Sequence, residues 1–195
     1  MARHVLVWDA PNVDMTLANI IEGKPTAHER PDMSVLAQWL VDHADGDEAE
    51  ACVFVNVAPH VAGPMRGWVM WLLEQGFRVF AKPKLDESDV DDDIIDHLEA
   101  RHAEGDLAAV YVGSNDARAF VEPLADLIDD GVVVSVLGFA EYAGGLSSLD
   151  GARFVDLESI EGMFAEALPR ITLDALPSEG RWFEPRGELG ESLHA

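Results

Sequence analysis

Positively charged side chains are scarce in this sequence. Lys and Arg number 13 against 37 Asp and Glu, so the formal net charge of the 195-residue chain is −24. Non-specific binding of nucleic acid depends on Lys and Arg that neutralise phosphates, and a field this negative repels a polyanion. The composition therefore disfavours broad nucleic-acid binding, and a nucleic-acid substrate would need a locally positive site on an acidic body.

Cysteine pairs and long apolar runs are also missing, and no leader is expected. Cys52 is the one cysteine and lies in the apolar run 51–55, which predicts a small core side chain in a reducing compartment and no zinc knuckle. Asp9 interrupts the first hydrophobic run, so no signal peptide is expected. No run reaches the roughly 20 apolar residues of a membrane span. We expect a cytoplasmic protein with no membrane partner.

Several motifs for handling phosphate or metal are absent as well. The chain has no glycine-rich loop of the P-loop or dinucleotide type. A haloacid-dehalogenase phosphatase needs an Asp where this chain has Pro11, and a response regulator needs one where the third predicted strand ends in Lys82. The histidines lack metal-ligand spacing. His97, beside Asp96, is the one candidate, against the alternative that it is a surface residue.

What the sequence does contain is a regular alternation of strands and helices. Short apolar runs predict strands buried on both faces, and helical spacing of apolar residues predicts the helices between them. Strands are expected at 4–8, 51–57, 77–81, 108–112, 132–137 and 154–157, and helices at 31–43, 63–75, 89–103 and 117–130. These elements predict an α/β fold, a three-layer α/β/α sandwich around a mostly parallel sheet of five or six strands.

We expect one domain at 1–168 and an extended tail at 169–195. The tail is rich in Pro and Gly, which favours an extended chain. It also contains Trp182 and Phe183, whose rings are costly to leave in water. The tail is therefore predicted to pack on the domain, with only its last residues loose.

Acidic and polar residues follow three of the predicted strands, the first, third and fourth. They are, in chain order, Asp9, Asn12, Lys82, Lys84, the acidic helix start 89–93, Ser114, Asp116 and Arg118. Ligands of an open parallel sheet bind outside the carboxyl ends of its strands. Carboxylates that converge there repel one another, and a hard cation such as Mg²⁺ relieves the repulsion while activating water and binding phosphate oxygens.

Each acid also has a structural alternative. Asp9, Asn12 and Asp116 have the residue type and position of helix caps, and the acids at 89–93 interact favourably with the dipole of a helix start. Asp92 and Asp96 lie four residues apart on one helix face, which is either a solvated face or part of a shared site. Only the gathering of three segments on one rim favours a functional site.

Taken in order, these motifs resemble the NYN domains, relatives of the PIN nucleases. The pattern apolar-Asp-x-x-Asn-apolar stands at 8–13, and an acidic stretch opens the mid-chain helix at 89–96. Ser114-Asn115-Asp116 occupies the place of the family's Ser-Gly-Asp and is followed by Phe120, with Gly138-Phe139 after the fifth strand. The resemblance covers residues 3–140 and implies a PIN-like domain that cleaves RNA with Mg²⁺ or Mn²⁺.

The resemblance also assigns roles to individual residues. It implies as catalytic residues Asp9, Asn12, Asp92 and Asp116. It implies as metal ligands Asp9, Asp92, Asp91 and Asp116, with Asp93 and Asp96 as alternatives for the mid-chain acid. Substrate binding is expected of Lys82, Lys84, Arg118 and Ser114. The family often has an Asp at the place of Arg118. The arginine found here either clamps a phosphate or marks a site that has lost catalysis.

Two functions are therefore left open. The first is a metal-dependent endoribonuclease with a narrow RNA substrate, and the second is a non-catalytic relative that binds RNA, a nucleotide or a protein partner. The apolar helix at 63–75 contains Trp68 and Trp71, which favour core packing or a homodimer surface over a platform for stacked bases.

Overall fold

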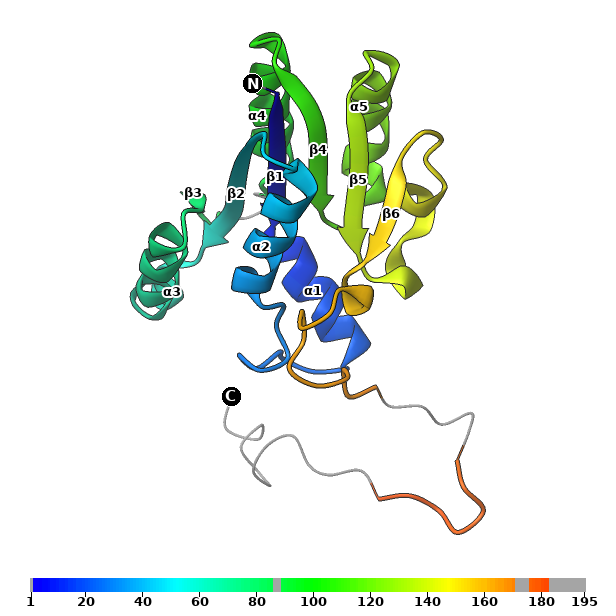
Figure 1. The fold of residues 1–195 in the computed structure, drawn as a ribbon. Coiled ribbons are helices and arrows are strands. Elements are labelled where there is room, and N and C mark those ends of the chain that lie inside the picture. Colours follow the sequence, from blue (N-terminus) through cyan, green and yellow to red (C-terminus); the bar gives the residue numbers. More distant parts are fainter. Residues whose placement is uncertain (1, 86–88, 171–175, 183–195) are drawn as a thin grey trace.

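The computed structural model describes residues 2–85, 89–170 and 176–182. Its centre is a sheet of six parallel strands in the order β3-β2-β1-β4-β5-β6 (Figure 1). The strands are β1 (Arg3–Asp9), β2 (Glu48–Val57), β3 (Arg78–Pro83), β4 (Leu107–Gly113), β5 (Val133–Gly138) and β6 (Arg153–Asp156). The predicted α/β class is confirmed, and the sheet is parallel throughout with the short sixth strand present.

Helices cover both faces of the sheet. They are α1 (Ala10–Ile20), α2 (Met33–Ala44), α3 (Ala62–Glu74), α4 (Asp91–Ala103) and α5 (Ala117–Asp129). Because side chains alternate along a strand, β1 sends Leu6 into a core with α1, α2 and α3 and Val7 into a second core with α4 and α5. The result is the expected three-layer α/β/α sandwich.

Helix α1 is the element that the apolar periodicity did not predict. It begins directly after β1, with Asp9 as its N-cap and Pro11 in its first turn. Pro is tolerated there because the first backbone N–H groups of a helix have no partner within the helix. A strand that runs straight into a helix leaves no loop, so the side chains of this junction are held by both elements.

The end of the domain at 1–168 is packed, whereas the aromatic ring described in the tail is not. Met163 and Leu168 are buried, and the Asp32 N–H donates to the Met163 carbonyl at 2.8 Å. Trp182, by contrast, is 93% exposed, so the prediction that this ring packs on the core is wrong. The described residues beside Trp182 are mainly Pro, Gly and charged or polar side chains, which offer the ring little apolar area to bury. Phe183 lies outside the described residues. Within the described part, no helix is long and apolar enough to cross a membrane.

Candidate active site

The carboxyl ends of β1 and β4 lie side by side in the middle of the sheet, where the chain order of the strands reverses. The chain leaves β1 for α1 on one face and leaves β4 for α5 on the other (Figure 1). Such a switch point opens a crevice between the two connections, and open α/β sheets bind their ligands there. The residues predicted to follow the first and fourth strands thus lie where this fold places its sites.

Asp9 is the last residue of β1 and is only 2% exposed. Its Oδ1 accepts a hydrogen bond from the Asn12 backbone N–H at 3.1 Å, which caps α1, and its Oδ2 accepts from the Ser114 hydroxyl at 3.0 Å. The cap that the sequence offered as an alternative role is therefore present. A carboxylate oxygen has two lone pairs, so each oxygen of Asp9 retains one for a cation.

The charge of Asp9 is costly to maintain in this position. Burial raises the pKa of Asp9 to about 6, the hydrogen bonds from Asn12 and Ser114 act against that rise, and the charges of Asp116 and Asp89 add to it. An acid that titrates near neutral pH and is surrounded by further acids is typical of a functional site. A structural cap would not require the neighbouring carboxylates.

Hydrogen bonds join the loop after β4 to the start of α1. Ser114 is fully buried, and its Oγ donates to Asp9 while accepting the backbone N–H of Asp116 at 3.1 Å. The backbone N–H of Asn115 donates to Asn12 Oδ1 at 2.8 Å. The Asn12 carboxamide, expected to act beside Asp9, thus also holds the β4 loop in place. Ser114, expected to bind substrate, holds the Asp9 carboxylate.

Asn115 is a residue of this site whose role the sequence did not reveal. Its Nδ2 donates to the Phe139 carbonyl at 3.0 Å, and its Oδ1 accepts the Phe139 N–H at 3.0 Å. A Cβ at Gly138 would lie only 2.8 Å from the carboxamide atoms of Asn115. The signal available in the sequence was an Asn in the place of the family's Gly, with Gly138-Phe139 at the end of the next strand. Asn115 fixes the ends of β4 and β5 relative to one another.

Asp116 caps α5 and lines an open hollow at the crevice. Its Oδ1 accepts the backbone N–H groups of Arg118 and Ala119 at 2.9 and 3.2 Å, so the cap uses one carboxylate oxygen. The hollow is lined by Asp89, Asp91, Asp92, Ile95, Asp116, Arg118 and Ala119. Arg118 is exposed and is the one cationic residue of this lining. The hollow therefore combines several acids with a single guanidinium.

The acidic residues at the start of α4 differ in burial. Burial raises the pKa of Asp91 to about 7, and the charges of Asp9, Asp89, Asp116 and Asp92 add to that rise, with Asp9 the strongest of the four. Asp92 lines the same hollow but is exposed. Asp91, which the resemblance ranked second, is thus a mid-chain acid on which the charge of Asp9 acts more strongly than that of any other neighbouring carboxylate.

The remaining candidates of this region do not line the hollow. Asp93 forms an ion pair with Lys82, which ties the end of β3 to the first turn of α4. Lys84 donates its backbone N–H to the Val57 carbonyl at 2.9 Å and exposes its side chain. Asp96 is exposed on the second turn of α4 and is not part of the lining of the hollow. Lys82 therefore positions α4 through its ion pair with Asp93, whereas the side chain of Lys84 extends to the surface.

The donor set of the crevice suits a hard cation. All of its acidic donors are carboxylate oxygens, which Mg²⁺ and Mn²⁺ prefer. In the described residues, the carboxylates of the crevice do not bring three ligand atoms within 4.8 Å of one another. A cation would draw them closer or bind partly through water, which Mg²⁺ commonly retains in proteins.

The raised pKa values predict an unusual dependence of stability on pH. The folded protein binds the Asp9 proton more tightly than the unfolded chain does, so this stabilising contribution is complete below the unfolded pKa of 3.8 and is lost as the pH rises through about 6. In the presence of a chelator, we expect Asp9 to lower the free energy of unfolding by on the order of 1–3 kcal/mol between about pH 4 and pH 7. Urea denaturation over this range measures it.

The matched variants for this experiment are Asp9→Asn and Asp96→Asn. Asp9→Asn removes the titrating group, so its stability should fall less steeply with pH than that of the wild type. Asp96→Asn removes an exposed acid of α4 and should reproduce the wild-type slope. An unchanged slope in Asp9→Asn would show that Asp9 titrates at its ordinary pKa.

Comparison with known proteins bears on the fold alone. No family model and no curated protein matches the chain. Among solved structures, the chain is similar to the crystal structure of a protein of unknown function from Vibrio parahaemolyticus, with a TM-score of 0.60, 20% sequence identity, and coverage of 81% of this chain and 94% of that chain. At this identity, the similarity shows that the two proteins share the architecture of the parallel sheet and its helices.

Proposed function

We propose that the chain is a metal-dependent ribonuclease of the NYN kind, which hydrolyses RNA at the crevice between β1 and β4 with Mg²⁺ or Mn²⁺ as its cofactor. The observation that carries the proposal is the pair Asp9 and Asp91, whose pKa values are raised by burial and by neighbouring carboxylates to about 6 and about 7. Acids held in that state favour a divalent cation, which relieves their repulsion and replaces their protons.

Each residue around the crevice has a role in this proposal. Asp9, Asp91 and Asp116 would hold the cation, with Asp92 beside them on the wall of the hollow. A bound Mg²⁺ supplies a more acidic water and neutralises charge on phosphoryl oxygens. Ser114 keeps the Asp9 carboxylate in one orientation through its hydroxyl. The cap of α5 does the same for Asp116 and leaves Oδ2 out of the cap.

Arg118 is the residue through which the hollow would recognise a phosphate. It is exposed on a wall whose other charged residues are acids, and a planar guanidinium can donate two parallel hydrogen bonds to phosphate oxygens. A divalent cation bound among the acids offsets two of their negative charges and, together with Arg118, gives phosphate oxygens a cationic contact. This contact would act against the repulsion that a chain of net charge −24 exerts on RNA.

One edge of the molecule is less acidic than the rest and leads to this hollow. The segment 62–85, which includes α3 and β3, has one acid, Glu74, and four cations, Arg66, Arg78, Lys82 and Lys84. Its formal charge is thus +3, within a chain of −24. Lys82 joins this edge to the first turn of α4 through Asp93. A single RNA strand that follows the edge would reach the hollow from the side of β3.

The proposal is tested by incubating the full chain with labelled single-stranded, hairpin and duplex RNAs. We expect cleavage of an unpaired region in Mg²⁺ or Mn²⁺ and none after treatment with a chelator, because the carboxylates then have no cation to hold. Product lengths on a denaturing gel measure the cut. Intact RNA under all conditions, together with no heat of Mn²⁺ binding by calorimetry, would exclude a metal-dependent nuclease.

Arg118 favours a second candidate function, a non-catalytic domain that binds RNA or a nucleotide. An arginine in place of the family's Asp removes a ligand and retains a phosphate contact. This candidate predicts a rise in the fluorescence anisotropy of labelled RNA without any cleavage, and a loss of that rise in Arg118→Ala. Cleavage that depends on Asp9 would exclude it.

A further inference from the structure

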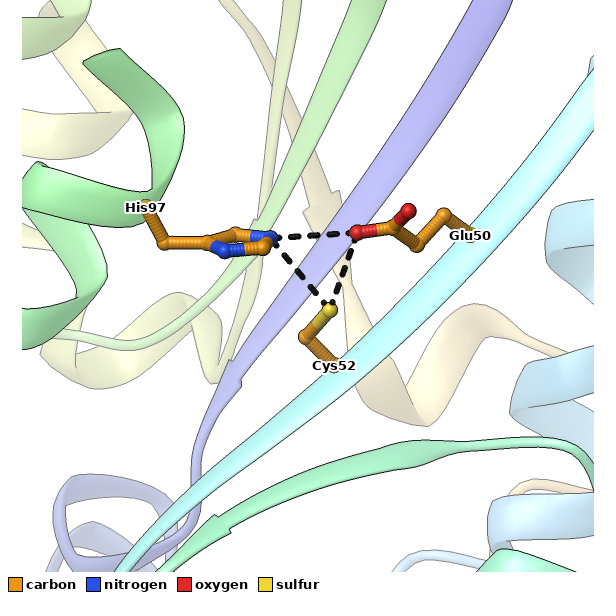
Figure 2. Close-up of side chains that lie close together, drawn as sticks. All are labelled: Glu50, Cys52 and His97. Atoms are coloured by element: carbon orange, nitrogen blue, oxygen red, sulfur yellow. Dashed lines mark hydrogen bonds and ion pairs between the residues drawn. The ribbon is translucent and has the colours of Figure 1, made fainter. Parts of the chain in front are cut away.

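A second cluster of side chains lies away from the crevice, between β2 and α4. Figure 2 shows Glu50 and Cys52 on β2 pointing toward His97 on α4. Glu50 and Cys52 are two residues apart, so they project from the same face of the strand. Glu50 and Cys52 are buried, and His97 is partly buried. The cluster faces the same side of the sheet as Asp91 but stands further back along β2, because Phe54 and not Cys52 pairs with Asp9.

The three candidate ligand atoms form a nearly equilateral triangle. Cys52 Sγ lies 3.4 Å from Glu50 Oε1 and 3.4 Å from His97 Nε2, and His97 Nε2 lies 3.2 Å from Glu50 Oε1. Bonds of about 2.0–2.3 Å around a tetrahedral Zn²⁺ place neighbouring ligand atoms about 3.3–3.7 Å apart. In the described residues, no other group offers three such atoms within 4.8 Å.

We propose that Glu50, Cys52 and His97 form a binding site for Zn²⁺ or a similar thiophilic divalent cation, separate from the carboxylates of the crevice. Thiolate, imidazole and carboxylate together are a donor set that zinc accepts, whereas Mg²⁺ takes oxygen ligands alone. Three protein ligands leave one position of the tetrahedron for water. The His97 side chain is 22% exposed, which gives the site a side toward solvent.

Two arginines beside Glu50 are compatible with the cation. Arg101 Nε donates to Glu50 Oε1 at 3.0 Å, and Arg78 Nε lies 3.8 Å from Oε2. A carboxylate has about four acceptor positions, so Glu50 can hold the cation while Arg101 fixes its orientation, as the partners of metal ligands commonly do. The charge of a divalent cation is balanced by the Glu50 carboxylate and the Cys52 thiolate, with one thiol proton released.

The surroundings of the Cys52 thiol disfavour nucleophilic catalysis, the other chemistry that a Cys beside a His suggests. A Cys beside a His can act as a nucleophile when its thiolate is stabilised. Here burial raises the pKa of Cys52 to about 12, and the charge of Glu50 and its hydrogen bond from the thiol add to that rise. The free thiol is therefore a poor nucleophile at neutral pH. A cation that displaces the proton changes this balance, and its affinity should increase with pH.

The test uses Co²⁺ as a spectroscopic probe on the full chain after treatment with a chelator. We expect one equivalent of Co²⁺ to give the near-ultraviolet band of thiolate-to-cobalt charge transfer with the visible bands of tetrahedral cobalt, and one equivalent of Zn²⁺ to abolish both. Cys52→Ser should eliminate the charge-transfer band. His97→Ala should weaken Co²⁺ binding by roughly 10-fold or more, since it removes one of three ligands.

Two control variants separate this site from its surroundings and from the proposed nuclease. His102→Ala removes a histidine of the same helix that pairs with Asp130, and it should leave Co²⁺ binding unchanged. Asp9→Asn should also retain the cobalt spectrum, so the result does not depend on the nuclease proposal. A spectrum without the charge-transfer band, or a band that persists in folded Cys52→Ser, would overturn the zinc site. Circular dichroism establishes that each variant is folded.

Discussion

Asp9→Asn is expected to lower the rate of Mg²⁺-dependent RNA cleavage by roughly 10²–10³-fold, the range found when one charged or preorganised contact is removed from a catalytic site. The substitution retains an oxygen for the Asn12 N–H but removes the negative charge that would hold the cation. The fold should be maintained, because an Asn side chain fills the same space and still caps α1. Single-turnover rates at saturating RNA measure the effect.

Two further variants test whether the loss of rate comes from the proposed cation site. Asp91→Asn should reduce the rate to a similar degree, because Asp91 is proposed to hold the cation and its pKa responds to the charge of Asp9. Asp96→Asn, on the exposed face of the same helix, should leave the rate within about 2-fold of the wild type, as expected for a surface position. Equal losses in Asp91→Asn and Asp96→Asn would contradict a specific role of Asp91 in holding the cation.

Gly113→Ala is expected to destabilise the protein by about 2–3 kcal/mol, the cost of forcing extra atoms into a packed core. Gly113 pairs with Trp8 across β1 and β4, and a Cβ at Gly113 would lie 2.1 Å from Cε3 of the indole. Trp8 is 3% exposed and packs in the core with α1 and α2, so the ring has little room to move. Urea denaturation measures the loss.

Gly67→Ala is the matched control for this substitution. Gly67 lies inside α3, and its added Cβ would meet no atom within 4 Å. Replacing a helical Gly by Ala in open space should stabilise the protein by up to about 1 kcal/mol. If Gly113→Ala were as stable as the wild type, the indole would have to shift, and Asp9, the next residue after Trp8, would then show a changed pH dependence.

Much of the fold could be predicted from the sequence because it depends on local patterns. The strands at β1, β2, β4 and β5 are continuous apolar runs, which follows from their burial on both faces. Helix α5 has the clear apolar periodicity of an element with one buried face. Helix α1 escaped prediction because Pro11 stands in its first turn with no loop before it, and the same residues suit a turn.

The candidate site could be predicted in part. The placement of Asp9 and Asp116 at strand ends followed from chain order and from the rule that parallel strands present their carboxyl ends on one edge. Asp91 and Asp92 are adjacent on α4, and successive helical residues project in directions about 100° apart. The choice between them depends on how α4 is set against the sheet, and the sequence contains no direct measure of that.

The scarcity of positive charge has a local exception, and the lone cysteine has surroundings that only the structure reveals. The scarcity of positive charge holds for the whole chain, but the segment 62–85 is locally positive. The lone Cys52 forms no disulfide and is buried, as predicted. Its neighbours Glu50 and His97 could not be paired in advance, because His97 lies 45 residues from Cys52 and 47 from Glu50.

The sequence by itself determined the order of strands and helices, the α/β class and the acids at the ends of the strands. These depend on burial and on backbone geometry, which act over a few residues. Only the tertiary structure decided that β1 and β4 are neighbours, that the charge of Asp9 acts on Asp91, and that Glu50, Cys52 and His97 meet. Contacts between distant segments depend on how whole helices pack on the sheet, and the free energy of that packing is shared among many side chains.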